Sequence, residues 1–229
     1  MPQELNAVIF DMDGTLVDSE RFHFQCWNEL LADFGIQLEY NFYNEQMAGI
    51  PTPGNAELII ATHHLDMDRE ELVEKREMLT QERLKTHTIE MMPYALETVE
   101  FFFGMGLPLA LVTGSPRHDT DLTLSKTGLD KFFEFSITRD DVANSKPDPE
   151  SYQKAVNRLG FSKETYVVFE DTPNGTKSAV SAGLTCYAVQ HNPAQHEQLN
   201  IARDIFLDLK VAREHVLNHW QINPAHRSG

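Results

Sequence analysis

The chain has 229 residues, of which 41% are hydrophobic, enough to bury the core of one α/β domain with or without an insertion. Lys and Arg total 19 against 35 Asp and Glu, which gives a formal net charge of −16. Such a charge repels nucleic acid and anionic lipid, so we expect neither as a partner. No apolar run approaches the roughly 20 residues that a membrane-spanning helix needs.

The beginning of the chain and its cysteines point to a cytoplasmic protein. The segment MPQELNAVIF enters an apolar run at once and lacks the basic region and long apolar stretch of a secretory signal. Cys26 and Cys186 are far apart and belong to no CxxC motif. We therefore expect two reduced thiols, and neither a disulfide framework nor a zinc site.

Short apolar runs alternate with helix-like stretches along most of the chain. The runs suited to buried parallel strands are Ala7–Phe10, Leu109–Thr113, Phe135–Thr138, Tyr166–Phe169, Thr185–Val189 and, more weakly, Asp204–Leu207. The helix-like stretches between them are Tyr94–Gly106, Arg117–Thr127, Pro149–Gly160 and Pro173–Gly183. This alternation predicts an α/β fold with a doubly wound, Rossmann-like parallel sheet.

One segment interrupts the alternation. Residues 19–91 contain no convincing strand, only helical patterns such as those over Phe22–Phe34 and Arg69–Thr86. We therefore expect a core formed by residues 1–18 and 92–229, and an inserted helical cap of residues 19–91. The insertion follows the first strand at its carboxyl end, where open α/β sheets bind ligands, so we expect the cap to act as a lid.

Acidic residues follow the first predicted strand. Asp11 and Asp13 stand two apart in the turn that leaves it, and Gly14 permits that turn. The Asp11 side chain and the Asp13 carbonyl can converge on one hard cation, which takes oxygen ligands. A turn without function would also use Asp and Gly. Paired acids at the end of a buried strand are nevertheless costly without a partner, which favours a functional role.

Other polar residues follow later strands. Thr113–Ser115 offer a hydroxyl and backbone N–H groups, although a helix N-cap explains them about as well. Lys146 lies in the segment KPDP before a helix, where the prolines restrict its direction, although most lysines simply face solvent. Glu170 and Asp171 end an apolar strand and form a second acidic pair. Together with Asp11 this pair predicts a divalent-cation site.

With its segments DMDGT, VTGS, KPDP, and ED followed by PNG, the chain resembles phosphatases of the haloacid dehalogenase superfamily, in the branch that contains β-phosphoglucomutase. The resemblance spans almost the whole chain and includes a helical cap between the first two motifs. A match to one motif would carry little weight, but four motifs at the expected strand ends are specific. The resemblance implies a monomeric enzyme that uses Mg²⁺ and acts on a small-molecule phosphate ester, such as a sugar phosphate.

The resemblance also implies catalytic roles. Asp11 would be the nucleophile that becomes an aspartyl phosphate, a step that divides hydrolysis into two easier ones. Asp13 would protonate the leaving oxygen and then activate water. Thr113 and the Gly114 amide would bind the phosphoryl group, and Lys146 would offset its charge. These roles suit phosphoryl transfer, which depends mainly on positioning and charge stabilisation.

The remaining roles concern metal and substrate. The Mg²⁺ ligands implied are Asp11, the Asp13 carbonyl and Asp171, with Glu170 acting directly or through a neighbouring ligand. Ser115, Arg117 and His23 are further candidates for substrate contact. Arg117 could equally belong to the first turn of a helix, and packing within the cap explains His23 about as well as substrate contact does.

Several alternatives remain open. Asp13 argues against a dehalogenase, which lacks this second acid, and the first cap helix shows no clear lysine of the kind a phosphonate hydrolase of this superfamily uses. A β-phosphoglucomutase-type mutase is harder to exclude, because Glu20–Trp27 and Asn44–Ile50 resemble its cap. Mutases of this branch bind a second phosphate through a cap arginine just beyond the loop glycine, whereas Ile50–Pro53 contains no cation. Hydrolysis is therefore favoured over intramolecular transfer.

Two further alternatives concern other classes of function. A non-catalytic sensor of a phosphorylated metabolite could use the same fold, but it would not need the complete set of acids and the lysine. A protein phosphatase would need an accessible site, and a cap of some 70 residues disfavours folded partners.

Overall fold

The computed structural model describes residues 3–222 and divides the chain into two compact units. The core unit consists of Met1–Val17 and Glu90–Gly229, and the cap unit consists of Asp18–Ile89. Within the core unit, the Met92 amide donates a hydrogen bond of 2.9 Å to the Leu16 carbonyl, and Val17 forms an isolated β-bridge with Met91. The chain therefore leaves the core unit and returns to it at one place.

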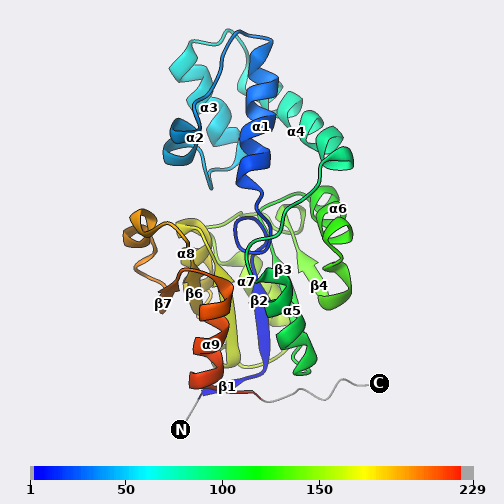
Figure 1. Cartoon of the computed structure of the whole chain (residues 1–229), viewed down its shortest axis with the longest axis vertical. Coiled ribbons are helices and arrows are strands. Elements are labelled where there is room, and N and C mark those ends of the chain that lie inside the picture. Colours follow the sequence, from blue (N-terminus) through cyan, green and yellow to red (C-terminus); the bar gives the residue numbers. More distant parts are fainter. Residues whose placement is uncertain (1–2, 223–229) are drawn as a thin grey trace. The chain divides into compact units, whose positions relative to one another are not determined.

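A six-stranded parallel sheet forms the centre of the core unit (Figure 1). From one edge to the other its strands are β4 (Phe135–Ile137), β3 (Leu109–Val112), β2 (Ala7–Phe10), β5 (Tyr166–Glu170), β6 (Thr185–Val189) and β7 (Asp204–Phe206). Each neighbouring pair is parallel. Strands added after β2 extend the sheet first on one side and then on the other, so the carboxyl ends of β3, β2 and β5 meet at a topological switch point, where such sheets bind ligands.

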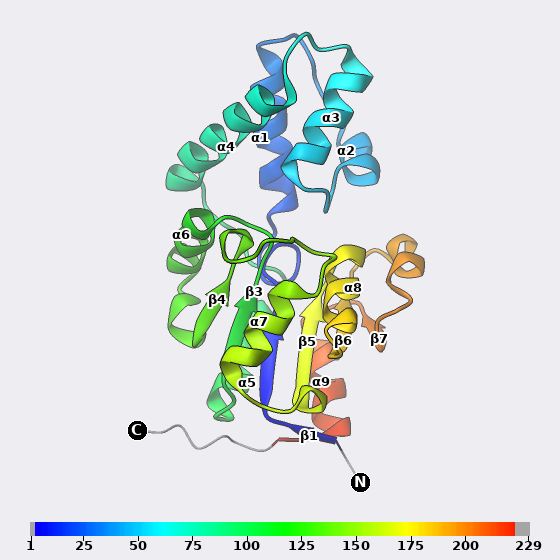
Figure 2. The same cartoon turned by 180° about the vertical axis from the view of Figure 1, so that it is seen from behind.

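Helices cover both faces of this sheet. On one face lie α5 (Ala95–Gly104) and α9 (Leu209–His219), and on the other lie α7 (Glu150–Leu159) and α8 (Pro173–Ser181), as Figures 1 and 2 show. Because both faces are covered, β2 and β3 are apolar along their whole length, and β5 is apolar up to Glu170, its last residue. The rings of Phe10, Phe102 and Phe169 pack together, with centroids between 5.3 and 6.4 Å apart.

The predicted doubly wound α/β fold is confirmed. Every strand and helix expected in the core is present, with ends shifted by at most two residues, and α6 spans Arg117–Thr127 as predicted. Short 3₁₀ turns complete the connections: η1 (Asp130–Phe132), η2 (Arg139–Asp141), η3 (Lys163–Thr165) and η4 (Pro193–Leu199).

Near its two ends the chain forms elements that the sequence did not predict. These are α9 and a separate two-stranded parallel sheet of β1 (Gln3–Leu5) and β8 (Trp220–Ile222). Strands of three residues carry too little periodicity to be recognised. Trp220 fixes the position of β8, because its indole N–H donates to the Tyr187 hydroxyl over 3.0 Å in the interior.

The cap unit is helical. It consists of α1 (Glu20–Ala32), α2 (Tyr40–Gln46), α3 (Thr52–His63) and α4 (Arg69–Thr86). The sequence predicted helices over α1 and α4 but did not resolve α2 and α3. Trp27, Leu31, Tyr43, Ile59 and Leu72 are among the residues buried at the centre of this unit.

Side chains also fix the loop that connects α2 and α3. The Glu20 carboxylate accepts hydrogen bonds from the Tyr43 hydroxyl (2.5 Å) and the Gly49 amide (3.2 Å). The Asn55 amide donates to the carbonyls of Met47 (3.1 Å) and Ile50 (3.0 Å). The cap loop, whose sequence resembles that of a mutase, is therefore hydrogen-bonded to α1 and α3 of its own unit.

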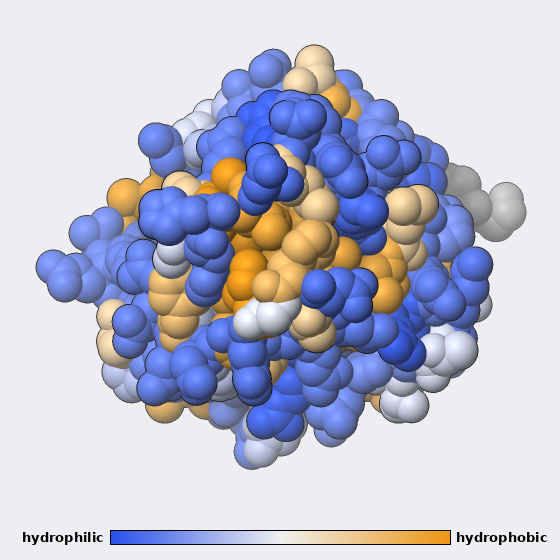
Figure 3. Space-filling model, turned by 90° about the horizontal axis from the view of Figure 1, so that it is seen from above, coloured by the Kyte–Doolittle hydropathy of each residue, from blue (hydrophilic) through white to orange (hydrophobic). Residues whose placement is uncertain are grey.

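Hydrophilic residues predominate on the face of the molecule drawn in Figure 3, where they surround a central apolar area. Among the described residues, no helix combines the length and the apolar character that crossing a membrane would require.

Candidate active site

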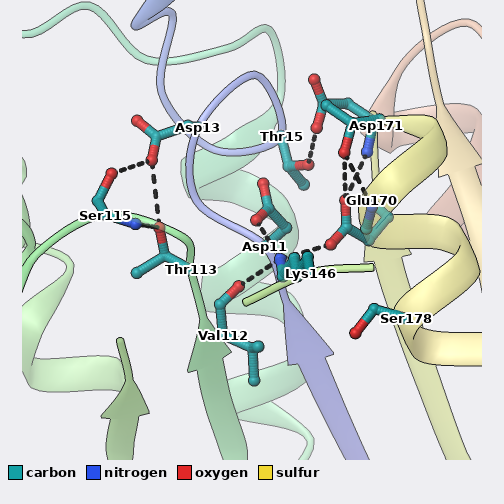
Figure 4. A network of polar contacts seen from close by, with 12 residues as sticks. Asp11, Asp13, Thr15, Val112, Thr113, Ser115, Lys146, Glu170, Asp171 and Ser178 are labelled. Carbon is teal, nitrogen blue, oxygen red and sulfur yellow. Dashed lines mark hydrogen bonds and ion pairs between the residues drawn. The ribbon is translucent and has the colours of Figure 1, made fainter. Parts of the chain in front are cut away.

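The polar residues of the predicted motifs lie at the carboxyl ends of neighbouring strands (Figure 4). Asp11 follows β2, Thr113 follows β3, and β5 ends at Glu170. The register pairs Phe10 with Leu111 on one side and with Phe169 on the other, and the Asp11 amide donates to the Phe169 carbonyl over 3.0 Å. Three segments that are distant in sequence therefore meet at one edge of the sheet.

Lys146 extends from the loop before α7 into this group of acids. Its ammonium donates to Asp11 Oδ1 over 2.7 Å, to Glu170 Oε1 over 2.6 Å and to the Val112 carbonyl over 2.9 Å. These three acceptors use all three of its protons. The side chain is only 11% exposed, and its two acidic partners are more deeply buried still. The lysine is thus fixed in direction between two carboxylates.

Charge in this group is unbalanced. Burial raises the pKa of Asp11 to about 8, with a further contribution from Glu170, while Lys146 acts in the opposite direction. Burial lowers the pKa of Lys146, but the charges of Asp11 and Glu170 outweigh burial and the net shift is upward. Two buried acids therefore share one ammonium, and the raised pKa of Asp11 indicates that this ammonium does not offset the burial of both.

The Asp13 carboxylate lies beside the hydroxyls that follow β3. Its Oδ2 accepts from Ser115 Oγ over 2.7 Å and from Thr113 Oγ1 over 3.2 Å, and the Ser115 amide donates to Thr113 Oγ1 over 3.0 Å. Gly14, which follows Asp13, has a φ of 81° that favours glycine. This turn directs Asp13 away from the Lys146 ammonium, so the two aspartates of the first motif have different partners.

Three carboxylates can serve one cation. Asp11, Glu170 and Asp171 each offer an oxygen within 4.8 Å of the others. Asp171 also lies close to the first motif, because Thr15 Oγ1 donates to Asp171 Oδ1 over 3.5 Å and a Cβ on Gly14 would lie 2.1 Å from Asp171 Oδ2. Carboxylate oxygens together with an excess of negative charge suit a hard divalent cation such as Mg²⁺.

Comparisons with known proteins agree with this arrangement. A family model described as haloacid dehalogenase-like hydrolase matches residues 8–189. The chain belongs to this family. Over 215 residues it is 31% identical to the "phosphorylated carbohydrates phosphatase" of Thermotoga maritima, covering 93% of this chain and 97% of the relative.

Two further relatives of this haloacid dehalogenase-like hydrolase indicate the range of reactions nearby. The fructose-1-phosphate phosphatase of Escherichia coli is 30% identical over 190 residues, with 83% of this chain and 99% of the relative covered. A candidate β-phosphoglucomutase from Thermotoga maritima matches in structure with a TM-score of 0.75 and 26% identity, over 93% of this chain and 99% of the other. The named relatives therefore include both phosphatases and a mutase-like protein.

Most of the site residues named from the sequence lie together in the core unit. They are Asp11, Asp13, Thr113, Gly114, Ser115, Lys146, Glu170 and Asp171. Gly114 stands between the two hydroxyl residues and faces open space, since nothing lies within 4 Å of the place where its Cβ would be.

The other two named residues are Arg117 and His23, and the hydrogen bonds of each are made within its own unit. The Arg117 guanidinium donates to Asp141 over 2.6 Å and to the Ser136 carbonyl over 3.0 Å, and these bonds tie the start of α6 to β4 and η2. His23 belongs to the cap unit, where its Nδ1 lies 3.2 Å from the Arg76 guanidinium and its carbonyl accepts from that same group.

Sequence reasoning missed three contributors to the site. They are the Val112 carbonyl, which accepts from Lys146, Thr15, which contacts Asp171, and Tyr152, whose hydroxyl donates to Glu170 over 2.6 Å. A backbone carbonyl has no signal in the sequence. Thr15 belongs to the DMDGT segment and could have been chosen for that reason, whereas Tyr152 has the helical spacing of an ordinary core residue.

Proposed function

We propose that this protein is a Mg²⁺-dependent phosphatase that hydrolyses a small phosphomonoester through an aspartyl-phosphate intermediate on Asp11. One observation carries the proposal: the buried Asp11 carboxylate is bonded to Lys146 and lies within cation-binding distance of Glu170 and Asp171, at the edge of the sheet where Asp13 and two hydroxyls are also found. The phosphatases among its relatives support the same reaction class.

The first chemical step transfers the phosphoryl group to Asp11. A carboxylate oxygen of Asp11 forms a bond to phosphorus while the bond from phosphorus to the ester oxygen breaks. Asp13 donates its proton to the departing oxygen, which leaves as an alcohol. The Lys146 ammonium, already 2.7 Å from Asp11, offsets the negative charge that gathers between the nucleophile and the phosphoryl oxygens.

The second step releases phosphate. Asp13, now ionised, takes a proton from a water molecule, whose oxygen attacks the phosphorus atom. The bond between phosphorus and Asp11 breaks and restores both carboxyl groups. We assign hydrogen bonds to the phosphoryl oxygens to the hydroxyls of Thr113 and Ser115, and their position beside Asp13 supports this assignment.

The residues that would hold Mg²⁺ are Asp11, Asp171 and the Asp13 carbonyl, with Glu170 beside them. Bound there, the ion would supply positive charge to the transferring phosphoryl oxygens.

For the substrate we propose a sugar phosphate. Two of the relatives are named for phosphorylated carbohydrates and for fructose 1-phosphate. A phosphosugar mutase is the second candidate, since a candidate β-phosphoglucomutase is a structural neighbour. The absence of a cation over Ile50–Pro53 favours hydrolysis, because a mutase must bind a second phosphate while the first reacts. A cytoplasmic monomer remains the expectation from sequence.

The first test of this function is a phosphate-release screen over small phosphomonoesters, with p-nitrophenyl phosphate included and Mg²⁺ present. We expect release by the wild type and only background release by Asp11→Asn, since an amide is not a nucleophile for this step. Asp33→Asn, which changes an exposed acid of the cap unit, is the matched control and should retain full activity. Normal turnover by Asp11→Asn would exclude the mechanism, and isomerisation of β-glucose 1-phosphate without phosphate release would identify the mutase.

A further inference from the structure

A buried tyrosine lies directly against the pair formed by Lys146 and Glu170. Tyr152, in the first turn of α7, is 0% exposed, and its hydroxyl donates to Glu170 Oε1 over 2.6 Å. The Lys146 ammonium lies 5.1 Å from the centroid of the same ring, within the range of a cation–π contact. One side chain thus contacts both members of a buried ion pair, with its ring facing the cation and its hydroxyl bonded to the anion.

The surroundings of Glu170 explain why this contact matters. Lys146 and Tyr152 both donate to its Oε1. Its Oε2 accepts from the Asp171 amide over 3.3 Å and from Thr172 Oγ1 over 3.4 Å. Four donors therefore reach the two oxygens of this carboxylate, and the two shortest bonds are those to Oε1. Glu170 is therefore held in one orientation by the protein, and Tyr152 supplies one of its two shortest bonds.

A second buried tyrosine, Tyr166, provides a comparison, because its hydroxyl contacts no charged group among the described residues. Tyr166, in β5, is also 0% exposed, and its hydroxyl accepts from the Phe161 amide over 3.0 Å and donates to the Val156 carbonyl over 3.4 Å. Both partners belong to the backbone. Tyr152 differs because its hydroxyl reaches a charged side chain that also binds Lys146.

We propose that Tyr152 is a positioning residue for phosphoryl transfer: by holding Glu170 Oε1 in place, its hydroxyl keeps the Lys146 ammonium against Asp11. The proposal rests on the function proposed above. It assigns Tyr152 no contact with the substrate and no proton transfer. Without the hydroxyl, Glu170 Oε1 would keep only the hydrogen bond from Lys146. The Glu170 carboxylate could then move, and the Lys146 ammonium could move with it, away from Asp11. Residues that orient the charged groups of a site in this way commonly affect activity by 10- to 100-fold.

The test is Tyr152→Phe, which removes the hydroxyl and keeps the ring. We expect kcat to fall by about tenfold with little change in KM, because the lost contact stabilises charge that develops during transfer and does not bind the ground state. Tyr166→Phe is the matched control, since it removes one buried phenol from a neighbouring element, and its kcat should remain that of the wild type. An equal kcat for Tyr152→Phe and the wild type, or an equal loss in both variants, would overturn the proposal.

Two further measurements separate positioning from a general loss of packing. In a Glu170→Gln background, Tyr152→Phe should cost much less than in the wild type, because the carboxylate that it positions is already lost. Fully additive effects would contradict the proposal. A crystal structure of Tyr152→Phe gives a result independent of turnover: we expect Lys146 Nζ beyond hydrogen-bonding distance of Asp11, and an unchanged distance would refute the positioning role. If the wild type released no phosphate from any ester, the proposed function would fail, but this structural measurement would still decide the role of Tyr152.

Discussion

The core unit and the cap unit place their charged residues differently. In the core unit Asp11, Lys146 and Glu170 form a buried ion-pair group at the strand ends, with side chains 1 to 11% exposed. In the cap unit Arg76 is also buried, with its guanidinium donating to the His23 carbonyl, but several ion pairs lie at the surface. The pair of Arg83 with Glu29, for example, has side chains 49% and 42% exposed.

This difference indicates where function has shaped the molecule. Taking two charges out of water costs several kcal/mol per ion, roughly as much as their attraction returns, so stability alone does not explain the core group. Exposed ion pairs cost little to form and contribute little. The buried arrangement is best explained by chemistry, whereas the surface pairs of the cap are free to vary. Variants that remove a charge from the buried group of the core unit or from a surface pair of the cap unit test this explanation.

Lys146→Met should give the largest effect on stability. The change leaves Asp11 and Glu170 as neighbouring buried acids without their ammonium, and breaking a buried pair in this way typically costs about 3–5 kcal/mol. We expect that loss in the free energy of unfolding, measured by urea titration in a metal chelator, together with background phosphate release. Lys75→Met, which changes a half-exposed lysine of the cap unit, should leave both quantities near those of the wild type. Wild-type stability in Lys146→Met would show that the ammonium is not needed to compensate the two buried acids.

Gly175→Ala should have a smaller effect, which we expect to measure in activity. A Cβ at this position of α8 would lie 2.0 Å from Glu170 Oε2, so the carboxylate must move. Alanine is otherwise favoured over glycine within a helix by about 1 kcal/mol. We expect phosphate release to fall by about 10- to 100-fold and half-saturation to require more Mg²⁺, because Glu170 borders the cation site.

Gly104→Ala is the control for that change, since Gly104 also lies in a helix and has nothing within 4 Å of its missing Cβ. It should leave turnover unchanged. If Gly175→Ala kept wild-type turnover and Mg²⁺ dependence, the placement of Glu170 would have no part in the reaction.

The core could be predicted from sequence because apolar strands and helices alternate regularly along the chain. Strands covered on both faces must be apolar throughout, which is why Tyr166–Phe169 stood out, and residues that end adjacent parallel strands must meet at one edge. Asp11 and Asp171 could be placed together for that reason, and the resemblance to a known family assigned the roles. Glu170, which the sequence also named for this site, lies in the same cluster.

Other features have a weak local signal or none. Tyr152, Ala155 and Val156 follow the spacing of any buried helix face, so nothing in the sequence marks one of them as the partner of a carboxylate. Arg117 follows the VTGS segment and was for that reason a candidate for phosphate contact. Its guanidinium instead donates hydrogen bonds to β4 and η2, which lie further along the chain. The helix α9 was missed although Leu209, Ala212 and Val216 are buried on one face of it. These are consequences of tertiary packing, which a single sequence expresses weakly.

The smallest expected effect comes from Glu29→Gln, which removes a charge from a surface ion pair of the cap unit, whereas Lys146→Met removes one from the buried group. Arg83 Nε donates to Glu29 Oε2 over 2.8 Å and its second nitrogen contacts Oε1, so the geometry of this pair is as favourable as that of the buried one. Geometry alone would therefore predict similar losses. Exposure predicts otherwise, because water and salt replace most of what a surface pair provides. We expect the urea midpoint and the rate of phosphate release to stay within the scatter of repeated wild-type measurements, at both low and high salt. A marked loss at low salt that vanished at high salt would mean that the surface pair holds the cap unit together, and the contrast drawn between the two units would then be wrong.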